Sequence, residues 1–282
     1  MEEKRKIPNA FLVVLTLLFF EVLYFAFLTD WLDQWLVFRF HLPSIFIFFM
    51  TLMNVGISYY EYHGFGPQEG IVRSGRNHPH VALTFDDGPN PDFTNKILDI
   101  LKEKEVKAAF FMVGKHIEKY PEVAKRVYLE GHDIGNHTYS HRDLVPATRR
   151  TVIKEVQKCD QAIERVLGIK TTLFRPPRGI ISNNVRKLIV AMGFTIALWT
   201  VSALDWRGKS PKAMIRRIML HANGGGVILF HDSGALLRTE GASRENTVEA
   251  LPLVIDALKA SGFEIVLLSK MIRELDSIEE DG

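Results

Sequence analysis

The pattern of apolar and polar residues divides the chain into two parts. Two long apolar runs, 7–28 and 42–60, fill most of the first 60 residues, and each has about the 20 residues that a helix needs to cross a bilayer. Residues 62–79 contain four glycines and two prolines, which are typical of a linker. The sequence therefore predicts a membrane region over 1–61, a linker over 62–79 and a globular domain over 80–282.

Short apolar runs alternate with amphipathic stretches throughout the globular part. The apolar runs predict strands at 80–85, 108–113, 132–136, 172–175, 194–201, 226–230 and 264–268. The amphipathic stretches predict helices near 93–104, 121–130, 148–167, 182–192, 211–222 and 246–260, and from about 269. Strands that alternate with helices are typical of a parallel sheet with crossover helices, so this α/β pattern predicts a sheet that closes into a barrel.

The two apolar runs of the first part predict two transmembrane helices. The alternatives are one span with an interfacial helix, or a signal peptide followed by a buried helix. Against a signal peptide, the first run is long for its apolar region, and no Ala-x-Ala-like cleavage site follows it. A helical hairpin is therefore the interpretation that we favour.

Charged residues around the two runs predict the orientation of this hairpin. Lys4, Arg5 and Lys6 precede the first run, whereas Asp30 and Asp33 lie between the runs. Lys and Arg are enriched on the cytoplasmic side of membrane helices. The bias, a matter of a few charges, places both ends of the hairpin and the globular domain on the cytoplasmic face of a plasma or inner membrane.

Overall composition excludes little except a polyanion partner and an internal disulfide. The 35 Lys and Arg residues nearly balance the 33 Asp and Glu residues, for a net charge of +2. Such a balance predicts no nucleic-acid partner. Cys159 is the only cysteine, and it lies in a predicted helix, where a buried structural role is expected.

Two carboxylates and two histidines in the globular part predict a metal site. Asp86 and Asp87 end the first predicted strand, and His137 and His141 follow the third, four residues apart, a spacing that puts both rings on one face of a helical turn. One carboxylate with two imidazoles binds a divalent metal and leaves positions open for water and substrate. The second carboxylate would then serve as a general base, which predicts metal-assisted hydrolysis.

Further candidates follow other predicted strands. Arg175 and Arg178 flank two prolines, so Arg178 supplies the first backbone N–H after the pair, a candidate donor to an oxyanion. His231 ends a strand and is a candidate general acid. Asp205 and Trp206 follow another strand as a candidate orienting carboxylate and a wall for stacking a sugar. Because chemistry on such barrels sits at the carboxyl ends of strands, these residues are expected in one site.

With these segments identified, residues from about 78 to 270 resemble the polysaccharide deacetylase family, also called the NodB-homology family or carbohydrate esterase family 4. The matching motifs are, in chain order, 84–88, 137–141, 175–179, 205–206 and 229–231. The resemblance implies a distorted (β/α)7-8 barrel and a divalent metal, most often zinc, with cobalt, manganese or nickel as alternatives. It implies that Asp87, His137 and His141 bind the metal, that Asp86 is the base and that Arg175 orients this base.

The resemblance implies roles for the other motif residues as well. The amide of Arg178 would serve the oxyanion hole, and His231 would be the general acid. Leu229 and Trp206 would line the acetyl pocket, close to the candidate carboxylate Asp205.

Two positions depart from the family pattern. Ser202 stands where the fourth motif usually has a carboxylate, which we take to be the common partner of the acid histidine. The two interpretations are a less basic His231 and a His231 that another group orients. Arg178 stands where an aromatic residue is frequent in the family. An arginine at this position resembles some relatives that act on muramic-type sugars, and its guanidinium could meet a carboxylate or phosphate of the substrate.

The expected function is hydrolysis of the N-acyl amide, most often N-acetyl, of an amino sugar in a cell-envelope polysaccharide such as peptidoglycan. That substrate requires a domain outside the membrane. A cytoplasmic domain would instead favour a deacetylase or deformylase of a lipid-linked amino sugar. A third alternative is a glycan-binding protein without turnover, for which Ser202 argues and against which the intact Asp and His residues argue.

Overall fold

The computed structural model describes residues 46, 48–53, 56, 69–75, 79–234 and 243–279, the last four as backbone only. The chain divides into two compact units, Met1–Tyr60 and Glu61–Gly282. Both predicted membrane segments lie wholly or mostly outside the described residues, so the hairpin stays a prediction. No helix among the described residues is long and apolar enough to cross a membrane.

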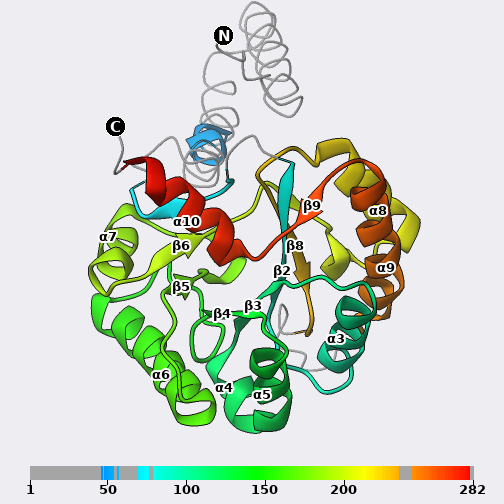
Figure 1. Cartoon of the computed structure of the whole chain (residues 1–282). Helices are drawn as coiled ribbons and strands as arrows, with labels where there is room; N and C mark the ends of the chain where they lie inside the picture. Colours follow the sequence, from blue (N-terminus) through cyan, green and yellow to red (C-terminus); the bar gives the residue numbers. More distant parts are fainter. Residues whose placement is uncertain are drawn as a thin grey trace, which may run out of the picture. The chain divides into compact units, whose positions relative to one another are not determined.

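The second unit is built on one parallel sheet (Figure 1). Its strands among the described residues are β1 (Ile71–Val72), β2 (His80–Asp86), β3 (Ala109–Met112), β4 (Asp133–Asn136), β5 (Leu173–Phe174), β6 (Thr195–Ala197), β7 (Val201–Ser202), β8 (Gly226–His231) and β9 (Glu264–Ile265). They are ordered β1-β6-β5-β4-β3-β2-β8-β7, and β9 also pairs with β2. Every pairing between these strands is parallel.

The order of the strands shows that the sheet curves into a distorted barrel. β7 is the last strand at one end of the order, and β6 is next to last at the other end. Only residues 198–200 separate β6 from β7 along the chain. So short a connection requires the two ends of the sheet to approach each other, and the structure therefore fits the predicted distorted (β/α)7-8 barrel.

The interruption between β6 and β7 corrects one sequence prediction. Residues 194–201 were expected to form a single strand, but the carbonyl groups of Ala197 and Leu198 accept hydrogen bonds from the guanidinium of Arg175, at 2.8 and 3.2 Å. These two carbonyls satisfy a buried cation instead of continuing a strand ladder. The apolar run therefore breaks where it meets the site.

Helices surround the sheet on the outside of the barrel, except for the last helix, which lies across the amino ends of the strands, where Ser269 donates to Asp133 of β4 (Figure 1). They are α3 (Thr94–Glu103), α4 (Gly114–Lys119), α5 (Pro121–Leu129), α6 (Arg149–Leu167), α7 (Asn183–Ala191), α8 (Pro211–His221), α9 (Glu245–Ala260) and α10 (Leu268–Glu279). All seven helices predicted for the globular part are present. The sequence did not predict α4, which has only six residues, or β1, which pairs with β6 from within the predicted linker.

Helix α6 illustrates how the sequence sets the limits of an element. The side chain of Thr148 accepts a hydrogen bond from the backbone N–H of Thr151 at 3.2 Å and caps the first turn. Gly168 ends the helix with φ 72°, a left-handed conformation that glycine adopts with little strain. The apolar face buries Val156 and Cys159, and this burial raises the pKa of the Cys159 thiol.

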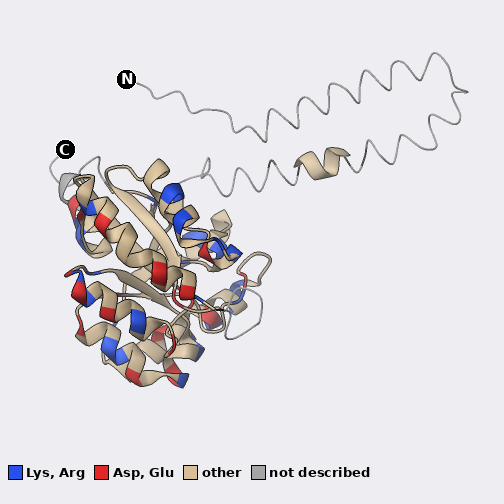
Figure 2. Cartoon of the chain, turned by 90° about the vertical axis from the view of Figure 1, so that its right-hand side faces the viewer, with Lys and Arg blue, Asp and Glu red and all other residues tan. Residues whose placement is uncertain are grey.

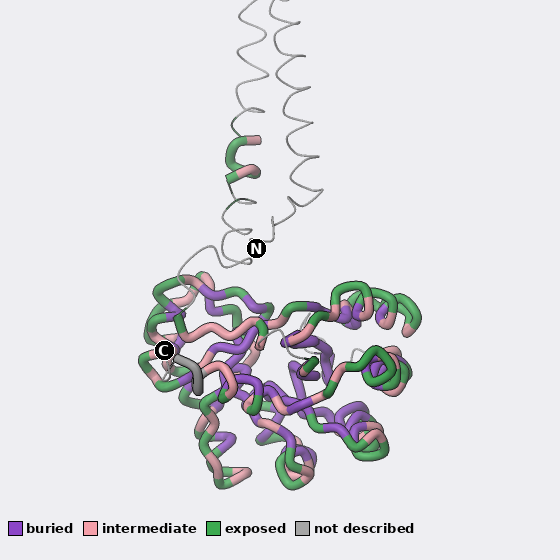
Figure 3. Tube along the Cα trace, turned by 45° about the horizontal axis from the view of Figure 1, so that its top comes forward, coloured by how far each residue is buried: buried purple, intermediate pink, exposed green. Residues whose placement is uncertain are grey.

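The strands form the buried centre of the unit, and the exposed residues lie mainly on the outer helices (Figure 3). Phe85 of β2 stacks between Phe110 of β3 and Phe230 of β8, with ring centroids 5.0 and 5.6 Å away. Burying one such side chain contributes about 2–3 kcal/mol. This packing fixes β2 and β8 side by side, and both strands end at the candidate site.

Candidate active site

Residues from four strands meet at one edge of the barrel. Because the strands are parallel, their carboxyl ends lie on the same side. Asp86 ends β2 and is paired in register with His231, which ends β8. His137 follows β4 and Arg175 follows β5. The predicted site residues therefore come together from distant parts of the sequence.

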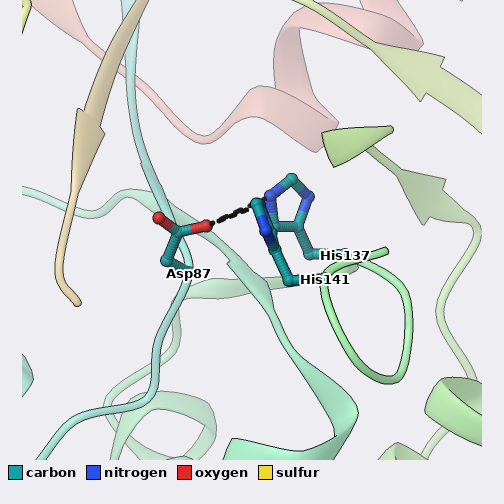
Figure 4. A group of neighbouring side chains, drawn as sticks. All are labelled: Asp87, His137 and His141. Carbon is teal, nitrogen blue, oxygen red and sulfur yellow. Dashed lines mark ion pairs between the residues drawn. The ribbon is translucent and has the colours of Figure 1, made fainter. Parts of the chain in front are cut away.

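Asp87, His137 and His141 form the group that could hold a metal ion (Figure 4). One ligand atom from each residue lies within 4.8 Å of the other two. Oδ1 of Asp87 is 3.0 Å from Nε2 of His141 and 3.5 Å from Nε2 of His137. One carboxylate and two imidazoles form the ligand set that zinc and similar ions accept.

Unsatisfied polar atoms show that these residues fit a cation. Both carboxylate oxygens of Asp87 and Nε2 of His141 are buried without a hydrogen-bond partner among the described residues. Leaving such an atom unsatisfied costs about 1–3 kcal/mol, and more when it is charged. A bound divalent ion would satisfy all three atoms at once.

Neighbouring groups orient the histidines and set the charges of the site. Nδ1 of His137 donates a hydrogen bond to the carbonyl of Arg175 at 2.8 Å, which leaves Nε2 free for a metal. Burial alone would raise the pKa of Asp87, but contacts with His137 and His141 bring it well below its usual value. Burial would likewise lower the pKa of His141, and Asp87 raises it instead. The site thus favours an ionised Asp87.

The two histidines do not lie on a helical turn, and the sequence expectation on this point is wrong. The segment from His137 to His141 is a loop, in which Thr138 and His141 have φ 65° and 53°. The backbone N–H of Thr138 donates to Oδ1 of Asn136 at 2.9 Å and stabilises the turn. The left-handed residues, rather than helical spacing, direct both rings towards Asp87.

Asp86 is held by a fully buried arginine. One terminal nitrogen of Arg175 donates to Oδ1 of Asp86 at 2.7 Å and to Oγ1 of Thr84 at 2.8 Å. The carbonyls of Ala197 and Leu198 accept from the other two guanidinium nitrogens. Arg175 therefore fixes Asp86 through Oδ1, and Oδ2 of Asp86 lies 3.8 Å from Nε2 of His137, on the side of the metal-ligand candidates.

Asp205 is the carboxylate partner of His231. Its Oδ1 accepts from Nδ1 of His231 at 2.8 Å, and its Oδ2 accepts from the backbone N–H of His231 at 2.7 Å and from Thr247 at 3.0 Å. Burial alone would lower the pKa of His231, but the Asp205 carboxylate raises it to about 9. Contact with His231 lowers the pKa of Asp205 against the effect of burial.

This pairing resolves the two interpretations of Ser202. The hydroxyl of Ser202 accepts from the backbone N–H of Leu204 at 3.2 Å, and its carbonyl accepts from Nε of Arg217 at 2.9 Å. Asp205, not the residue at position 202, orients His231. Of the two interpretations, the geometry supports the one in which a group other than residue 202 orients His231.

The remaining candidates lie around the site with different exposure. Arg178 has φ 59°, and its half-exposed side chain forms an ion pair with Asp143, Nε to Oδ1 at 3.2 Å. Trp206 is 37% exposed, with the guanidinium of Arg207 4.6 Å from its ring centroid. Leu229 is buried within β8. Arg178 and Trp206 are thus accessible to a substrate, whereas Leu229 lies below the surface.

Two residues that support the site were not found from the sequence. Oδ2 of Asp232, a buried carboxyl whose pKa burial raises to about 7, accepts from Thr94 at 2.7 Å and lies where a Cβ on Gly88 would have to stand. Nδ1 of His116 donates to the carbonyl of Asp87 at 2.7 Å. Asp232 directly follows the acid candidate, which is a usable signal, but nothing local singles out His116.

Comparison with known proteins identifies the family. The family model described as polysaccharide deacetylase matches residues 73–197. A peptidoglycan-N-acetylglucosamine deacetylase of Bacillus cereus is 39% identical over 197 residues, which are 70% of this chain and 70% of that protein. The chain belongs to the polysaccharide deacetylase family. As a polysaccharide deacetylase it is a hydrolase of carbon–nitrogen bonds other than peptide bonds.

Other members of the polysaccharide deacetylase family show how far this likeness extends. A chitooligosaccharide deacetylase of Sinorhizobium fredii is 36% identical over 69% of this chain and 93% of its own length. The crystal structure of a peptidoglycan N-acetylglucosamine deacetylase covers 72% of this chain and 92% of its own, with 38% identity and a TM-score of 0.68. A pseudoenzyme of the same family from Bacillus anthracis is 27% identical over 72% of this chain and 69% of its own, with a TM-score of 0.66.

Proposed function

We propose that this chain hydrolyses the N-acetyl amide of an amino sugar in a cell-envelope polysaccharide such as peptidoglycan, and that the reaction depends on a divalent metal. One observation supports this most directly. Asp87, His137 and His141 present unsatisfied ligand atoms beside Asp86, and His231 pairs in register with Asp86. These groups provide a metal site, a base and an acid within one buried edge of the barrel.

The metal would be held by Asp87, His137 and His141. Zinc suits this mixed oxygen and nitrogen set, and cobalt, manganese or nickel are alternatives. Such an ion polarises the amide carbonyl and lowers the pKa of bound water. Nδ1 of His137 is occupied by the carbonyl of Arg175, so its ring is fixed with Nε2 towards the ion.

Asp86 is the general base in this proposal. Its Oδ1 is fixed by Arg175, while Oδ2 points to the metal side, where the attacking water would lie. A carboxylate held in one orientation can accept the proton of that water at Oδ2 without rearrangement. Arg175 is therefore a positioning residue that acts through Asp86.

His231 is the general acid. Because Nδ1 is bound to Asp205, Nε2 is the nitrogen available to a substrate. A pKa of about 9 keeps the ring protonated at neutral pH, so Nε2 can donate its proton to the leaving amine nitrogen. Asp205 thus orients the acid and keeps it charged.

The groups at the mouth of the site would bind the sugar. The backbone N–H of Arg178 follows two prolines and would donate to the oxyanion. The indole of Trp206 offers an exposed face for a sugar ring, and Leu229 would contact the acetyl methyl group. The half-exposed guanidinium of Arg178 would meet an anionic group on the substrate.

The side of the membrane on which the catalytic unit lies decides between two candidate substrates. We propose that residues 7–28 and 42–60 anchor the chain in the plasma or inner membrane. Relatives named as peptidoglycan deacetylases favour a peptidoglycan substrate, which requires the catalytic unit on the outer face. The Lys and Arg bias of the first part favours the cytoplasmic face, where the substrate would be a lipid-linked amino sugar. Protease accessibility of the C-terminus in intact and inverted vesicles distinguishes the two orientations.

Acetate release by the purified full-length chain tests the proposed chemistry. The panel contains N-acetylglucosamine oligomers, peptidoglycan fragments and a lipid-linked amino sugar, each with added zinc or cobalt. We expect Asp86→Asn to keep the metal and to lower turnover by about 10²–10⁴-fold, because removing a general base has effects of this size. Full activity in Asp86→Asn would show that Asp86 is not the base.

A further inference from the structure

A groove beside the site is not used by the proposed chemistry. It lies between residues 144–152 and helix α7, and it has a volume of about 640 Å³. Leu144, Val152 and Val185 are buried and form an apolar floor. Arg149 and Lys187 are exposed and lie on opposite walls. The groove therefore combines an apolar base with a cationic rim.

Both walls of the groove follow site residues closely along the chain. Leu144 follows the metal-binding candidate His141 by three residues, so the two residues lie within about 11 Å of each other along the backbone. The opposite wall begins at Ser182, four residues after Arg178. The ion pair between Arg178 and Asp143 joins the two segments just before the groove starts. A ligand that extends from the reacting sugar past Arg178 would enter this groove.

The walls of the groove carry no negative charge. Residues 144–154 contain three cations and no carboxylate, and residues 175–204 contain four cations and no carboxylate. No described carboxylate lies within ion-pair distance of Arg149 or Lys187. The net charge of the whole chain is only +2, so the excess of positive charge at the groove is local. On the side that carries α3, α8 and α9, positive and negative residues are interspersed (Figure 2).

We infer that this groove binds an anionic peptide carried by the glycan strand, so that the substrate is a peptide-substituted amino-sugar polymer rather than a bare one. The inference rests on the proposed function. Free carboxylates of the peptide would pair with Arg149 and Lys187, and small apolar side chains would lie on Leu144 and Val185. An unsubstituted amino-sugar oligomer offers neither group.

The test compares two substrates that differ only in the peptide. One is a peptidoglycan strand with its peptides, and the other is the same strand after enzymatic removal of the peptides. The variant is the double charge reversal Arg149→Glu with Lys187→Glu. The matched control, Lys102→Glu with Lys107→Glu, makes the same change in charge on exposed residues at the opposite end of the barrel.

We expect the wild-type chain to prefer the peptide-bearing strand in kcat/KM. The groove variant should lower kcat/KM on that strand about tenfold, chiefly through KM, and leave the bare strand unchanged, because charge pairing at the groove acts on binding. The control variant should behave as the wild type on both strands. The inference is overturned if the groove variant changes both strands equally or neither strand, or if the wild type prefers the bare strand.

A failure of the proposed function would look different. The wild-type chain would then release no acetate from either strand although metal is bound. In that event binding of the released peptide to Asp86→Asn, measured by calorimetry, still tests the groove. Peptide binding that weakens when Arg149→Glu and Lys187→Glu are added to Asp86→Asn would support the groove as the peptide site. Absence of peptide binding would reject it.

Discussion

The turns at the two ends of the barrel use the left-handed conformation in different ways. At the carboxyl ends of the strands it is adopted mostly by residues with side chains. These residues are Asp87, Thr138, His141, Arg178 and Leu204, with Gly179 and Gly208 as the exceptions. At the amino ends it is adopted mostly by glycine, with Glu105 as the exception. These glycines are Gly70, Gly131, Gly168, Gly193, Gly225 and Gly262.

The two ends differ in their left-handed residues because only the carboxyl ends carry the side chains of the site. A left-handed conformation costs a residue with a Cβ roughly 1–2 kcal/mol, whereas glycine adopts it freely. The turns at the amino ends only reverse the chain, so glycine serves there. Near the site, two left-handed residues are metal-ligand candidates, and Leu204 directly precedes the orienting carboxylate Asp205. Strain of this kind is common at functional sites, where surrounding contacts hold it in place.

The largest effect is expected at Asp87. Asp87→Ala removes a ligand and should abolish metal binding and lower turnover by roughly 10³-fold or more, since the site then lacks both the ion and its charge. Metal content of the purified variant and acetate release measure this. Glu105→Ala removes the side chain of a left-handed residue at the opposite end and should keep both metal and turnover. A loss of activity in Glu105→Ala would contradict the division between the two ends.

The next largest effect is expected at Asp205, in the pH dependence of activity. His231, with its pKa raised to about 9, is protonated below that pH, so activity should fall as pH rises through 9. Asp205→Asn removes the carboxylate, and the fall should move towards the ordinary histidine pKa of about 6.5. At pH 8 the protonated fraction then drops roughly 30-fold. The pH profile of kcat for both proteins measures this, and an unmoved limb in Asp205→Asn would reject the assignment.

The smallest effect is expected at a glycine turn. Gly168→Ala introduces a Cβ at φ 72°, where no atom lies within 4 Å, so only backbone strain acts. We expect about 1 kcal/mol less free energy of unfolding and unchanged turnover. Gly168→Asn is the matched control, because asparagine tolerates this conformation better and should cost less. Denaturant unfolding measures both variants, and equal losses would show that strain is not the cause.

The sequence predicted the alternating order of elements and the residues that meet at the carboxyl ends of the strands, because both depend on local signals. Each apolar run of a parallel sheet is visible by itself, and each motif stands where a strand ends. The exceptions depend on contacts between distant residues. The run 194–201 breaks because Arg175 binds its carbonyls, and the loop at His137 is not helical because Asn136 and Thr138 close a turn.

The carboxylate partner of His231 is another contact that the sequence alone could not identify. Positions 202 and 205 lie three residues apart in the same motif, and spacing alone did not decide which of them partners the acid. The structure does, because Asp205 accepts from both the ring and the backbone of His231. His116 binds the carbonyl of Asp87 and Thr94 binds Asp232, each from another element, so only the folded chain shows their contribution.

The buried thiol of Cys159 has a practical consequence for labelling. It is the only cysteine in 282 residues, and burial raises its pKa, which disfavours the thiolate that reacts with maleimides. A second cysteine placed on the surface would be the single reactive position. A fluorophore attached there, on the rim beside Arg149 for example, would report on that position alone, without prior removal of the native cysteine.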